Sequence, residues 1–268
     1  MHHLNRSMSK SQLSFGPDLS FINADCSATE LQEIFSKLGI NNIVHAATHF
    51  TRSRQTEAVS DVIRANFDFS VRVFEAGKAV GANFINFNSF WQLEKDTDGL
   101  GLYAATKEAF RHYLEISASS TMEVYDIYIP ETFGPHDPRD KLVANLIRAR
   151  MEGQKYELQN PDLEIDLSYG PFLADFVSRL VLDQPRVSSR TAYVNFPGLS
   201  IGKIQQIIMS LPGEDEVVRQ GPRPIGIRGS KPQERTLANI TFEGAMPNSS
   251  LSELLSYTYL CYSTRPLR

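Results

Sequence analysis

Cysteine and long apolar runs are scarce in this sequence. Cys26 and Cys261 are the only cysteines among 268 residues, which is too few for a disulfide framework, and they do not form a zinc-binding spacing. The first ten residues are polar and lack the apolar core of a signal peptide. No run approaches the ~18 apolar residues of a membrane span. We therefore expect a protein of the reducing cytoplasm that has no membrane partner.

An excess of positive charge is also missing. The chain has 27 basic and 31 acidic residues, and this balance disfavours nucleic acid or an anionic membrane as a partner. His45, His49 and His136 share no ligand spacing, so no metal site is expected. Hydrophobic residues make up 41% of the chain, enough to bury a core. The length suits one large domain, or one domain with a small appended lobe.

Strand-like and helix-like patterns alternate along the chain, which favours an α/β fold with a parallel sheet covered by helices. Ser27 to Glu30 reads as a capping box, and Gly39 ends the helix that follows. We expect strands over 19–22, 42–46, 84–87, 124–129, 164–168 and 192–195. Further helices are expected over 56–80, 102–117, 142–151, 172–182, 201–211 and 251–262, and a loop-dominated stretch over 213–236.

The clearest chemical signal is the pair Tyr103 and Lys107. Residues four apart on a helix share one face, and an ammonium beside a phenol favours the phenolate and lowers the tyrosine pKa. Tyr103 is thus a candidate general acid/base for a carbonyl or alcohol, although the bare pattern also occurs by chance. Ser89 follows the strand over 84–87, where its hydroxyl could reach the reacting oxygen at the carboxyl edge of the sheet. The alternative is that Asn88 and Ser89 merely begin a turn.

Ser89, Tyr103 and Lys107 match the Ser/Thr–Tyr–Lys triad, and the chain resembles the extended short-chain dehydrogenases/reductases, the NAD-dependent epimerase/dehydratase family. Other segments follow in the family's order: Asp25-Cys26, 43–47, Asn66 and 132–135. Three pieces, 90–92, 102–110 and 134–142, look most like CDP-abequose and CDP-paratose synthases, which reduce a 4-keto nucleotide sugar.

The resemblance implies a Rossmann-like parallel sheet with helices on both faces and a small C-terminal substrate lobe. It places the cofactor domain in 1–135, with 160–200 contributing, and the substrate lobe mainly in 136–268. It also implies a nicotinamide cofactor, a nucleotide-sugar substrate and a homodimer formed through the helices over 56–80 and 102–117. Reduction, epimerisation and dehydration all remain open as the reaction.

The resemblance also assigns roles to residues. Tyr103 would exchange a proton with the sugar C4 oxygen, Lys107 would lower the Tyr103 pKa and hold the nicotinamide ribose, and Ser89 would orient the keto oxygen. The expected cofactor contacts are Arg6, Ser7, Asp25, Cys26, Ala46, Ala47, Asn66 and Lys107. The expected substrate contacts are Asn88, Trp91, Glu131, Arg139 and Lys141.

Several of these residues also have plainer interpretations. Arg6 would favour the 2′-phosphate of NADP over NAD, or it is a solvated arginine. Arg139 and Lys141 would pair with a nucleotide diphosphate, or they form a solvated cluster at a helix start. Trp91 would stack on a base or sugar, or it fills the core beneath the site.

One feature of the family is missing. The family opens with a strand, a G-x-x-G-x-x-G turn and a helix, but Gly16 is the only glycine before Gly39. We therefore expect the chain to begin at the family's second strand, with 2–5 as its remnant. The missing strand is central in the usual order, and without it the two strands before 42–46 have no neighbour on that side. Either the start was mis-assigned or cut, the strands have re-paired, or the gene product is degenerate. A catalytically silent binding or scaffold protein is therefore the competing hypothesis.

Overall fold

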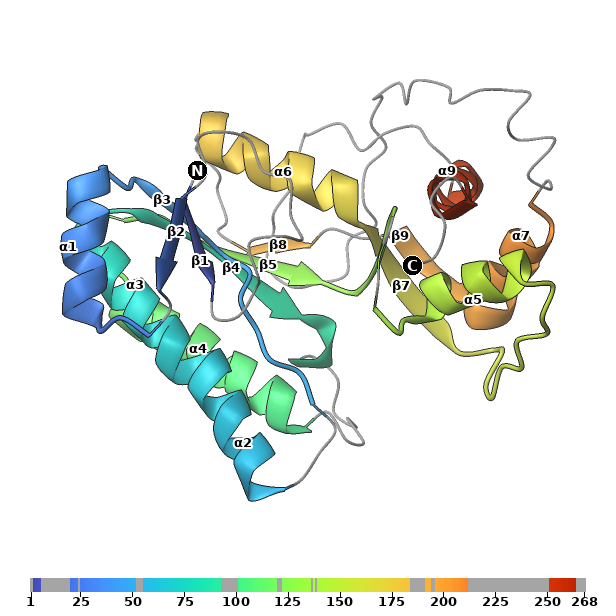
Figure 1. Ribbon diagram of the computed structural model, residues 1–268, viewed down its shortest axis with the longest axis horizontal. Coiled ribbons are helices and arrows are strands. Elements are labelled where there is room, and N and C mark those ends of the chain that lie inside the picture. The colour runs from blue at the N-terminus through green and yellow to red at the C-terminus, as the bar shows by residue number, and fades with distance from the viewer. Residues whose placement is uncertain are drawn as a thin grey trace. The chain divides into compact units, whose positions relative to one another are not determined.

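The computed structural model describes residues 2–5, 20–23, 25–51, 55–92, 101–119, 122–135, 137, 139–183, 191–193, 196–211 and 251–263. Arg6, Ser7, His136 and the loop expected over 213–236 lie outside these residues. The chain divides into two compact units, Met1–Asp126 and Ile127–Arg268, whose helices and strands are labelled in Figure 1. Parallel strand pairs and helices alternate along the first unit, and the predicted α/β class is confirmed.

The first two strands form a small sheet of their own. Strand β1 (His2–Asn5) pairs in parallel with β2 (Ser20–Asn23), with His2 opposite Ser20. Both expected strands are present. Among the described residues this pair is not hydrogen-bonded to the larger sheet that begins with β3. The discontinuity lies between β2 and β3, where the resemblance stated above implies a missing strand.

Helix α1 (Ala28–Leu38) begins and ends as its sequence predicts. The Ser27 hydroxyl accepts from the backbone N–H of Glu30 at 3.2 Å, and the Glu30 carboxylate accepts from the Ser27 N–H at 2.7 Å. These reciprocal bonds satisfy two N–H groups that a helix start leaves unpaired. Gly39 follows the last turn with φ at 61°, in the left-handed region that glycine adopts most easily. Leu31 and Phe35 form the buried face of α1.

Gly39→Ala should destabilise the first unit by about 1 kcal/mol, because a Cβ is strained at positive φ. An added methyl group would meet nothing within 4 Å, so the loss would come from the backbone alone. Gly39→Asn should lose less, since asparagine tolerates this conformation. Urea unfolding of the two variants measures the difference. Equal stability of Gly39→Ala and the unaltered chain would contradict the expectation.

The next segment supplies an edge strand and a long helix. Strand β3 (Asn42–His45) leads to α2 (Thr56–Ile63), a π-helical turn η1 (Arg64–Asp68) and α3 (Phe69–Ala79). The continuous helical stretch predicted over 56–80 is confirmed, but the π turn was not predicted. It puts Asn66 into an interrupted part of the helix, a feature that is frequent at functional sites.

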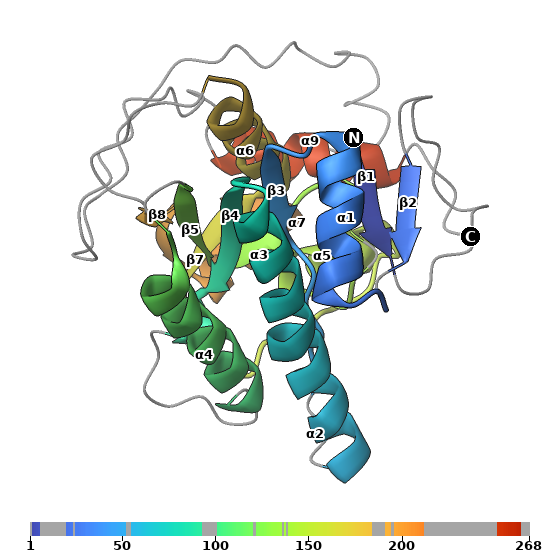
Figure 2. The ribbon, with the colours of Figure 1, turned by 90° about the vertical axis from the view of Figure 1, so that its left-hand side faces the viewer.

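Strand β4 (Asn83–Ser89) pairs in parallel with β3, with Ile43 opposite Phe84. A 3-10 turn η2 (Phe90–Gln92), helix α4 (Gly101–Ser117) and strand β5 (Val124–Ile129) follow it. With β8 (Thr191–Tyr193) they give a sheet of order β3-β4-β5-β8. Helices α3 and α4 contact each other and both contact β4, and Figure 2 shows them side by side.

Aromatic rings fill the core between this sheet and these helices. The ring of Phe84 lies edge-on to Phe74 at 5.3 Å and to Phe110 at 6.1 Å. All three side chains are at most 1% exposed. Burying each one contributes about 1.5–3 kcal/mol. This packing fixes β4 against α4, the two elements that carry the predicted triad.

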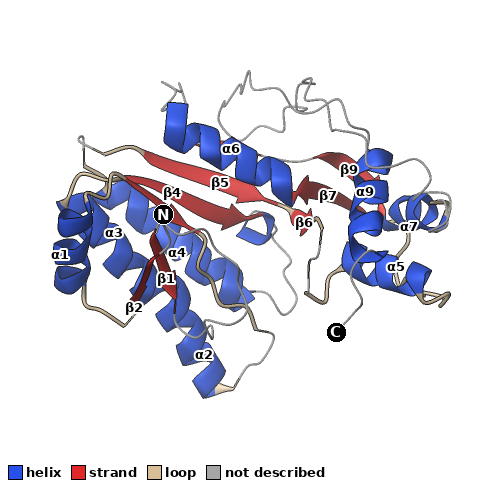
Figure 3. Cartoon of the chain, turned by 45° about the horizontal axis from the view of Figure 1, so that its top comes forward, coloured by secondary structure: helices blue, strands red, loops and turns tan. Residues whose placement is uncertain are grey.

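The second unit contains a three-stranded sheet of order β6-β7-β9. Strand β6 (Glu131–Phe133) pairs in parallel with β7 (Glu164–Tyr169), which pairs antiparallel with β9 (Phe196–Ser200). The described helices of this unit are α5 (Leu142–Met151), α6 (Gly170–Asp183), α7 (Ile201–Met209) and α9 (Leu251–Ser263). Helices α5, α7 and α9 contact one another and can be followed in Figure 3. The short strands β6 and β9 were not predicted.

Candidate active site

The strand β4 and the helix α4 bring the predicted triad to one place. Ser89 is the last residue of β4, and Tyr103 and Lys107 lie on successive turns at the start of α4. The hydroxyls of Ser89 and Thr48 lie near enough to the Tyr103 phenol to lower its pKa. The Phe50 ring lies edge-on to the Tyr103 ring at 5.5 Å. A hydroxyl at the end of β4 and a hydroxyl from the loop after β3 therefore lie near the Tyr103 phenol.

The Lys107 side chain is buried next to the end of β4. Its side chain is 4% exposed, and its Nζ donates a hydrogen bond to the carbonyl oxygen of Phe87 at 2.8 Å. Burial lowers the pKa of Lys107 to about 8, against the opposing charge of Asp126. The amine therefore changes charge near pH 8.

The Tyr103 pKa differs from the sequence-based expectation. Burial raises the pKa of Tyr103, and the nearby hydroxyls of Thr48 and Ser89 only partly oppose that rise. The lowering that was expected from Lys107 is not found. A phenol with a raised pKa is a weaker acid, but it keeps its proton at neutral pH, so Tyr103 is present in the protonated form that could give a proton to an oxygen.

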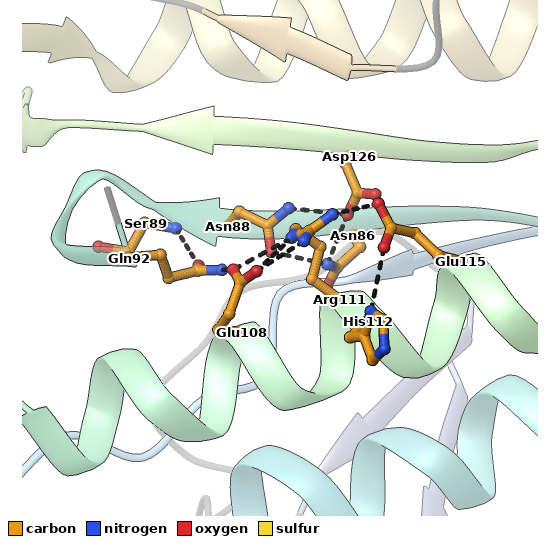
Figure 4. Close-up of polar contacts among 9 residues, drawn as sticks. All are labelled: Asn86, Asn88, Ser89, Gln92, Glu108, Arg111, His112, Glu115 and Asp126. Atoms are coloured by element: carbon orange, nitrogen blue, oxygen red, sulfur yellow. Dashed lines mark hydrogen bonds and ion pairs between the residues drawn. The ribbon is translucent and has the colours of Figure 1, made fainter. Parts of the chain in front are cut away.

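A buried amide and carboxylate cluster lies beside β4 (Figure 4). One oxygen of Asp126 accepts from Asn86 Nδ2 at 2.9 Å and from Asn88 Nδ2 at 2.7 Å. Burial raises the pKa of Asp126, and these two hydrogen bonds oppose the rise. Asn88 was predicted to contact the substrate. Its side chain is 1% exposed, and its amide is hydrogen-bonded to Asp126. Its hydrogen bond supports the end of β4, next to Ser89.

A second chain of contacts ties Ser89 to α4. The Ser89 N–H donates to Gln92 Oε1 at 2.7 Å, and Gln92 Nε2 donates to Glu108 at 3.0 Å. Arg111 bonds Glu108 at 2.6 Å and also pairs with Glu115. Figure 4 shows this row of side chains running along the helix. The main chain of Ser89 is therefore fixed relative to the helix that carries Tyr103.

The loop after β3 is open to solvent. Ala46 and Ala47 are both exposed at the carboxyl end of β3. Asn66 is 2% exposed, and its amide bonds Thr48, both main-chain groups of His49, and Thr106. The bonds found for Asn66 thus go to protein groups, and its contact with a cofactor stays a prediction.

Of the remaining predicted residues of the first unit, Trp91 contacts the triad, because its backbone N–H donates to Ser89 Oγ at 3.4 Å. Asp25 is exposed and Cys26 is half-buried, and the Cys26 carbonyl accepts from Arg72. Trp91 lies on η2 and is 43% exposed. That exposure excludes the interpretation of Trp91 as a core residue and leaves the stacking role as a prediction.

In the second unit, the two basic residues that were predicted to bind a nucleotide diphosphate form ion pairs with carboxylates of the chain. Lys141 bonds Glu131 at 2.9 Å, and Arg139 bonds Asp137 at 2.6 Å and the Thr132 hydroxyl at 2.9 Å. The Arg139 guanidinium beside Asp137 holds the pKa of that carboxyl below its usual value. Binding of a diphosphate by Arg139 would have to compete with this ion pair.

Sequence reasoning missed two residues of this region, Thr48 and Asp126. Thr48 follows the alanine pair that was recognised, but nothing local shows that its hydroxyl faces Tyr103. Asp126 is an acidic residue inside an otherwise apolar strand, an exception that signals a buried partner. In the part of the chain that the structure describes, no group of His, Cys, Asp or Glu is arranged to hold a metal ion. None of the described helices is long and apolar enough to cross a membrane.

A comparison with protein-family models identifies the family of this chain. The model of the NAD dependent epimerase/dehydratase family matches residues 1–167. No curated protein matches the sequence significantly. Among solved structures, UDP-glucose 4-epimerase from Thermotoga maritima with UDP-glucose is 16% identical, with a TM-score of 0.67 over 93% of this chain and 86% of that one.

Two further structures are similar. The enzyme WbmH from Bordetella bronchiseptica, in complex with NAD+, is 15% identical with a TM-score of 0.66, covering 98% of this chain and 90% of that one. The dTDP-4-dehydrorhamnose reductase from Bacillus anthracis, in complex with NADP, is 14% identical with a TM-score of 0.57, covering 72% and 71%. At these identities the likeness establishes the Rossmann-like fold.

Proposed function

Because the chain belongs to the NAD-dependent epimerase/dehydratase family, we propose that it is a nicotinamide-dependent oxidoreductase or epimerase that acts on a nucleotide sugar. The observation that carries the proposal is the meeting of the end of β4 with the start of α4. There Lys107 Nζ donates to the Phe87 carbonyl at 2.8 Å, and Ser89 lies near enough to the Tyr103 phenol to lower its pKa. The similar structures with UDP-glucose and with NAD+ agree with this substrate and cofactor class.

The reaction we propose is hydride transfer at C4 of the sugar, between a carbonyl and an alcohol. The nicotinamide, when bound, supplies or accepts the hydride. Tyr103 gives its phenolic proton to the C4 oxygen in reduction and takes it back in oxidation. Ser89 donates a hydrogen bond to that oxygen and orients it. Lys107, as an ammonium, stabilises the phenolate left on Tyr103.

Three residues of the first unit are our proposed contacts to the nicotinamide dinucleotide. Ala46 and Ala47 are exposed at the carboxyl end of β3, where we propose that the dinucleotide binds, and Lys107 supplies a buried amine beside the Phe87 carbonyl. The finer proposal, drawn from the subgroup resemblance, is a 4-ketoreductase of the CDP-abequose synthase type that uses NADP. Glu131, Arg139 and Lys141 are the proposed contacts to the nucleotide sugar.

Calorimetric titration of the full-length chain with NADP+ and NAD+ tests cofactor binding. The proposal expects saturable binding of at least one dinucleotide. A panel of 4-keto nucleotide sugars, with CDP, UDP and dTDP as nucleotides, then tests oxidation of the reduced cofactor. Dinucleotide binding without turnover of any 4-keto sugar would remove the reductase assignment.

The split of the sheet supports one alternative, a catalytically silent binding or scaffold protein. Among the described residues the β1-β2 pair forms a sheet separate from the one that begins with β3, whereas the dinucleotide site of this fold lies at the edge of one continuous parallel sheet. A silent protein would bind a nucleotide sugar, but neither NAD+ nor NADP+. The same calorimetry, repeated with UDP-glucose, separates the two functions.

The proposed role of Lys107 predicts a basic limit to the reaction. The rate should fall as pH rises through about 8, where Lys107 loses its proton. In Asp126→Asn the charge that raises the Lys107 pKa is removed, so this limit should move to lower pH. A profile of kcat against pH measures it, with Asp175→Asn, from an exposed ion pair with Arg179, as the control. A limit that stays in place in Asp126→Asn would contradict the coupling.

A further inference from the structure

The side chain of Gln92 closes the turn that follows β4. Its Oε1 accepts from the Ser89 N–H at 2.7 Å, and its Nε2 donates to Glu108 Oε2 at 3.0 Å. A main-chain N–H only donates and an ionised carboxylate only accepts, so both contacts require the amide to lie this way round. The proposed reaction uses Ser89 but gives no part to Gln92. Only a side chain with an acceptor and a donor at its tip can join these two groups.

Glu108 is kept ionised and in place by its neighbours on α4. Arg111 donates to both carboxylate oxygens, from Nε at 2.9 and 3.0 Å and from Nη2 at 2.6 Å. These hydrogen bonds lower the pKa of Glu108, and the charges of Arg111 and His112 lower it further. Arg111 also pairs with Glu115, and Figure 4 shows these side chains in a row along the helix. Gln92 therefore donates to a negatively charged group that α4 holds in position.

The same turn fixes Ser89 at a second atom. The Trp91 N–H donates to Ser89 Oγ at 3.4 Å, so the hydroxyl oxygen accepts within the turn. A serine hydroxyl carries a single hydrogen, and this contact does not use it. The Ser89 N–H is thus held by Gln92 and the Ser89 oxygen by Trp91, whereas the O–H can donate to a substrate oxygen.

We infer that Gln92 is a positioning residue of this site: its amide joins the Ser89 main chain to Glu108 and so sets where the Ser89 hydroxyl lies. The inference rests on the proposed function, in which that hydroxyl orients the sugar C4 oxygen. It also explains why the position requires an amide. A carboxylate there would put a second negative oxygen where Nε2 now lies, 3.0 Å from Glu108 Oε2. Two carboxylates that close do not both ionise readily, and the pKa of one is raised.

Exchange of the two side chains tests the inference. Gln92→Glu is prepared alone and together with Glu108→Gln. In the paired variant the new carboxylate accepts from the Ser89 N–H and the new amide donates to that carboxylate, so the link is restored with the same net charge. Gln32→Glu, the same change at an exposed position of α1, is the control for added charge.

The first measurement follows the Ser89 amide itself and needs neither cofactor nor sugar. The full chain is labelled with ¹⁵N-serine, and the Ser89 signal is assigned by its loss in Ser89→Ala. In Gln92→Glu this signal should titrate with a midpoint about one to two units above the ordinary glutamate pKa of about 4.3. Below the midpoint a proton shared by the two carboxylates replaces the lost amide hydrogen, and above it they repel and the link is lost.

The paired variant and Gln32→Glu should show no titration of the Ser89 amide above the ordinary glutamate pKa. A Ser89 signal that does not respond to pH in Gln92→Glu would overturn the inference. An equal response in the paired variant would also overturn it, because the polarity of the link would then not matter.

The second measurement is kcat, divided at each pH by kcat of the unaltered chain. For Gln92→Glu this ratio should stay near one below the midpoint and fall about 10- to 100-fold above it, as expected for a displaced reacting group. The paired variant should regain most of the loss, and Gln32→Glu should stay within about twofold of the unaltered chain. A ratio that is the same at every pH would show that the link does not position Ser89 for the reaction. If the unaltered chain turns over no 4-keto sugar, the proposed function fails and the amide titration alone decides on Gln92.

Discussion

Tyr103→Phe should reduce kcat by about 10³-fold, the typical contribution of a positioned general acid/base. The substitution removes only the phenolic oxygen, and the ring keeps its edge-on contact with Phe50 at 5.5 Å. The substitution should therefore slow the chemical step and leave ligand binding little changed. Steady-state kinetics measure it, with calorimetry to verify that dinucleotide affinity changes little.

Tyr113→Phe is the matched control. Tyr113 lies on the same helix α4, and its hydroxyl donates to Glu75 at 2.9 Å, away from Ser89 and Lys107. Its variant should keep kcat within about twofold, as expected for a residue without contact to the reacting atoms. Equal losses in Tyr103→Phe and Tyr113→Phe would point to a general weakening of α4 and would remove the acid/base role.

The chain should lose stability on the acid side through His45, by on the order of 4–5 kcal/mol at its limit. His45 is 4% exposed among the rings of Phe69, Phe84 and Phe110. Burial lowers its pKa to about 3, with a smaller contribution from Lys107. Because Ser70 donates its proton to Asn66 O, His45 Nε2 must donate to Ser70 at 2.8 Å. The buried ring is therefore neutral.

The direction follows from proton uptake. Between pH 6.5 and about 3 the unfolded chain binds a proton at His45 and the folded chain does not, so acid favours unfolding. The slope from this group is about 1.4 kcal/mol per pH unit. Urea unfolding over a pH series should show a smaller acid loss in His45→Phe, which keeps a ring in the pocket.

His112→Gln provides the control, because His112 is exposed on α4 and should leave the acid slope unchanged. An acid slope in His45→Phe that equals that of the unaltered chain would show that His45 is not the responsible group. The carboxylates contribute to acid unfolding in all three proteins alike and cancel in the comparison.

Much of the fold could be predicted because its determinants are local. The capping box at Ser27 and Glu30 and the left-handed Gly39 are contained in a dozen residues, and both are found. The π turn around Asn66 is different, since it depends on contacts with His49 and Thr106. Strand β9 contains Pro197 and Gly198, which weaken the strand signal, and it exists by pairing with β7.

The site could be predicted only in part, for the same reason. Tyr103 and Lys107 were found because helix geometry places residues four apart on one face. The predicted lowering of the Tyr103 pKa was wrong. Burial, a tertiary property, raises that pKa more than the neighbouring hydroxyls lower it. Thr48 and Asp126 could not be assigned, since each acts through a partner at least 38 residues away.

The proposed reaction is tested most directly by following the hydride itself. The full chain is incubated with NADPH deuterated at C4 and a 4-keto nucleotide sugar, and the product is analysed by mass spectrometry and NMR. We expect deuterium at C4 of the sugar with the unaltered chain and none above background with Tyr103→Phe. A chain that binds the dinucleotide but leaves the sugar free of deuterium, or one that transfers it equally well without the phenol, would contradict the account.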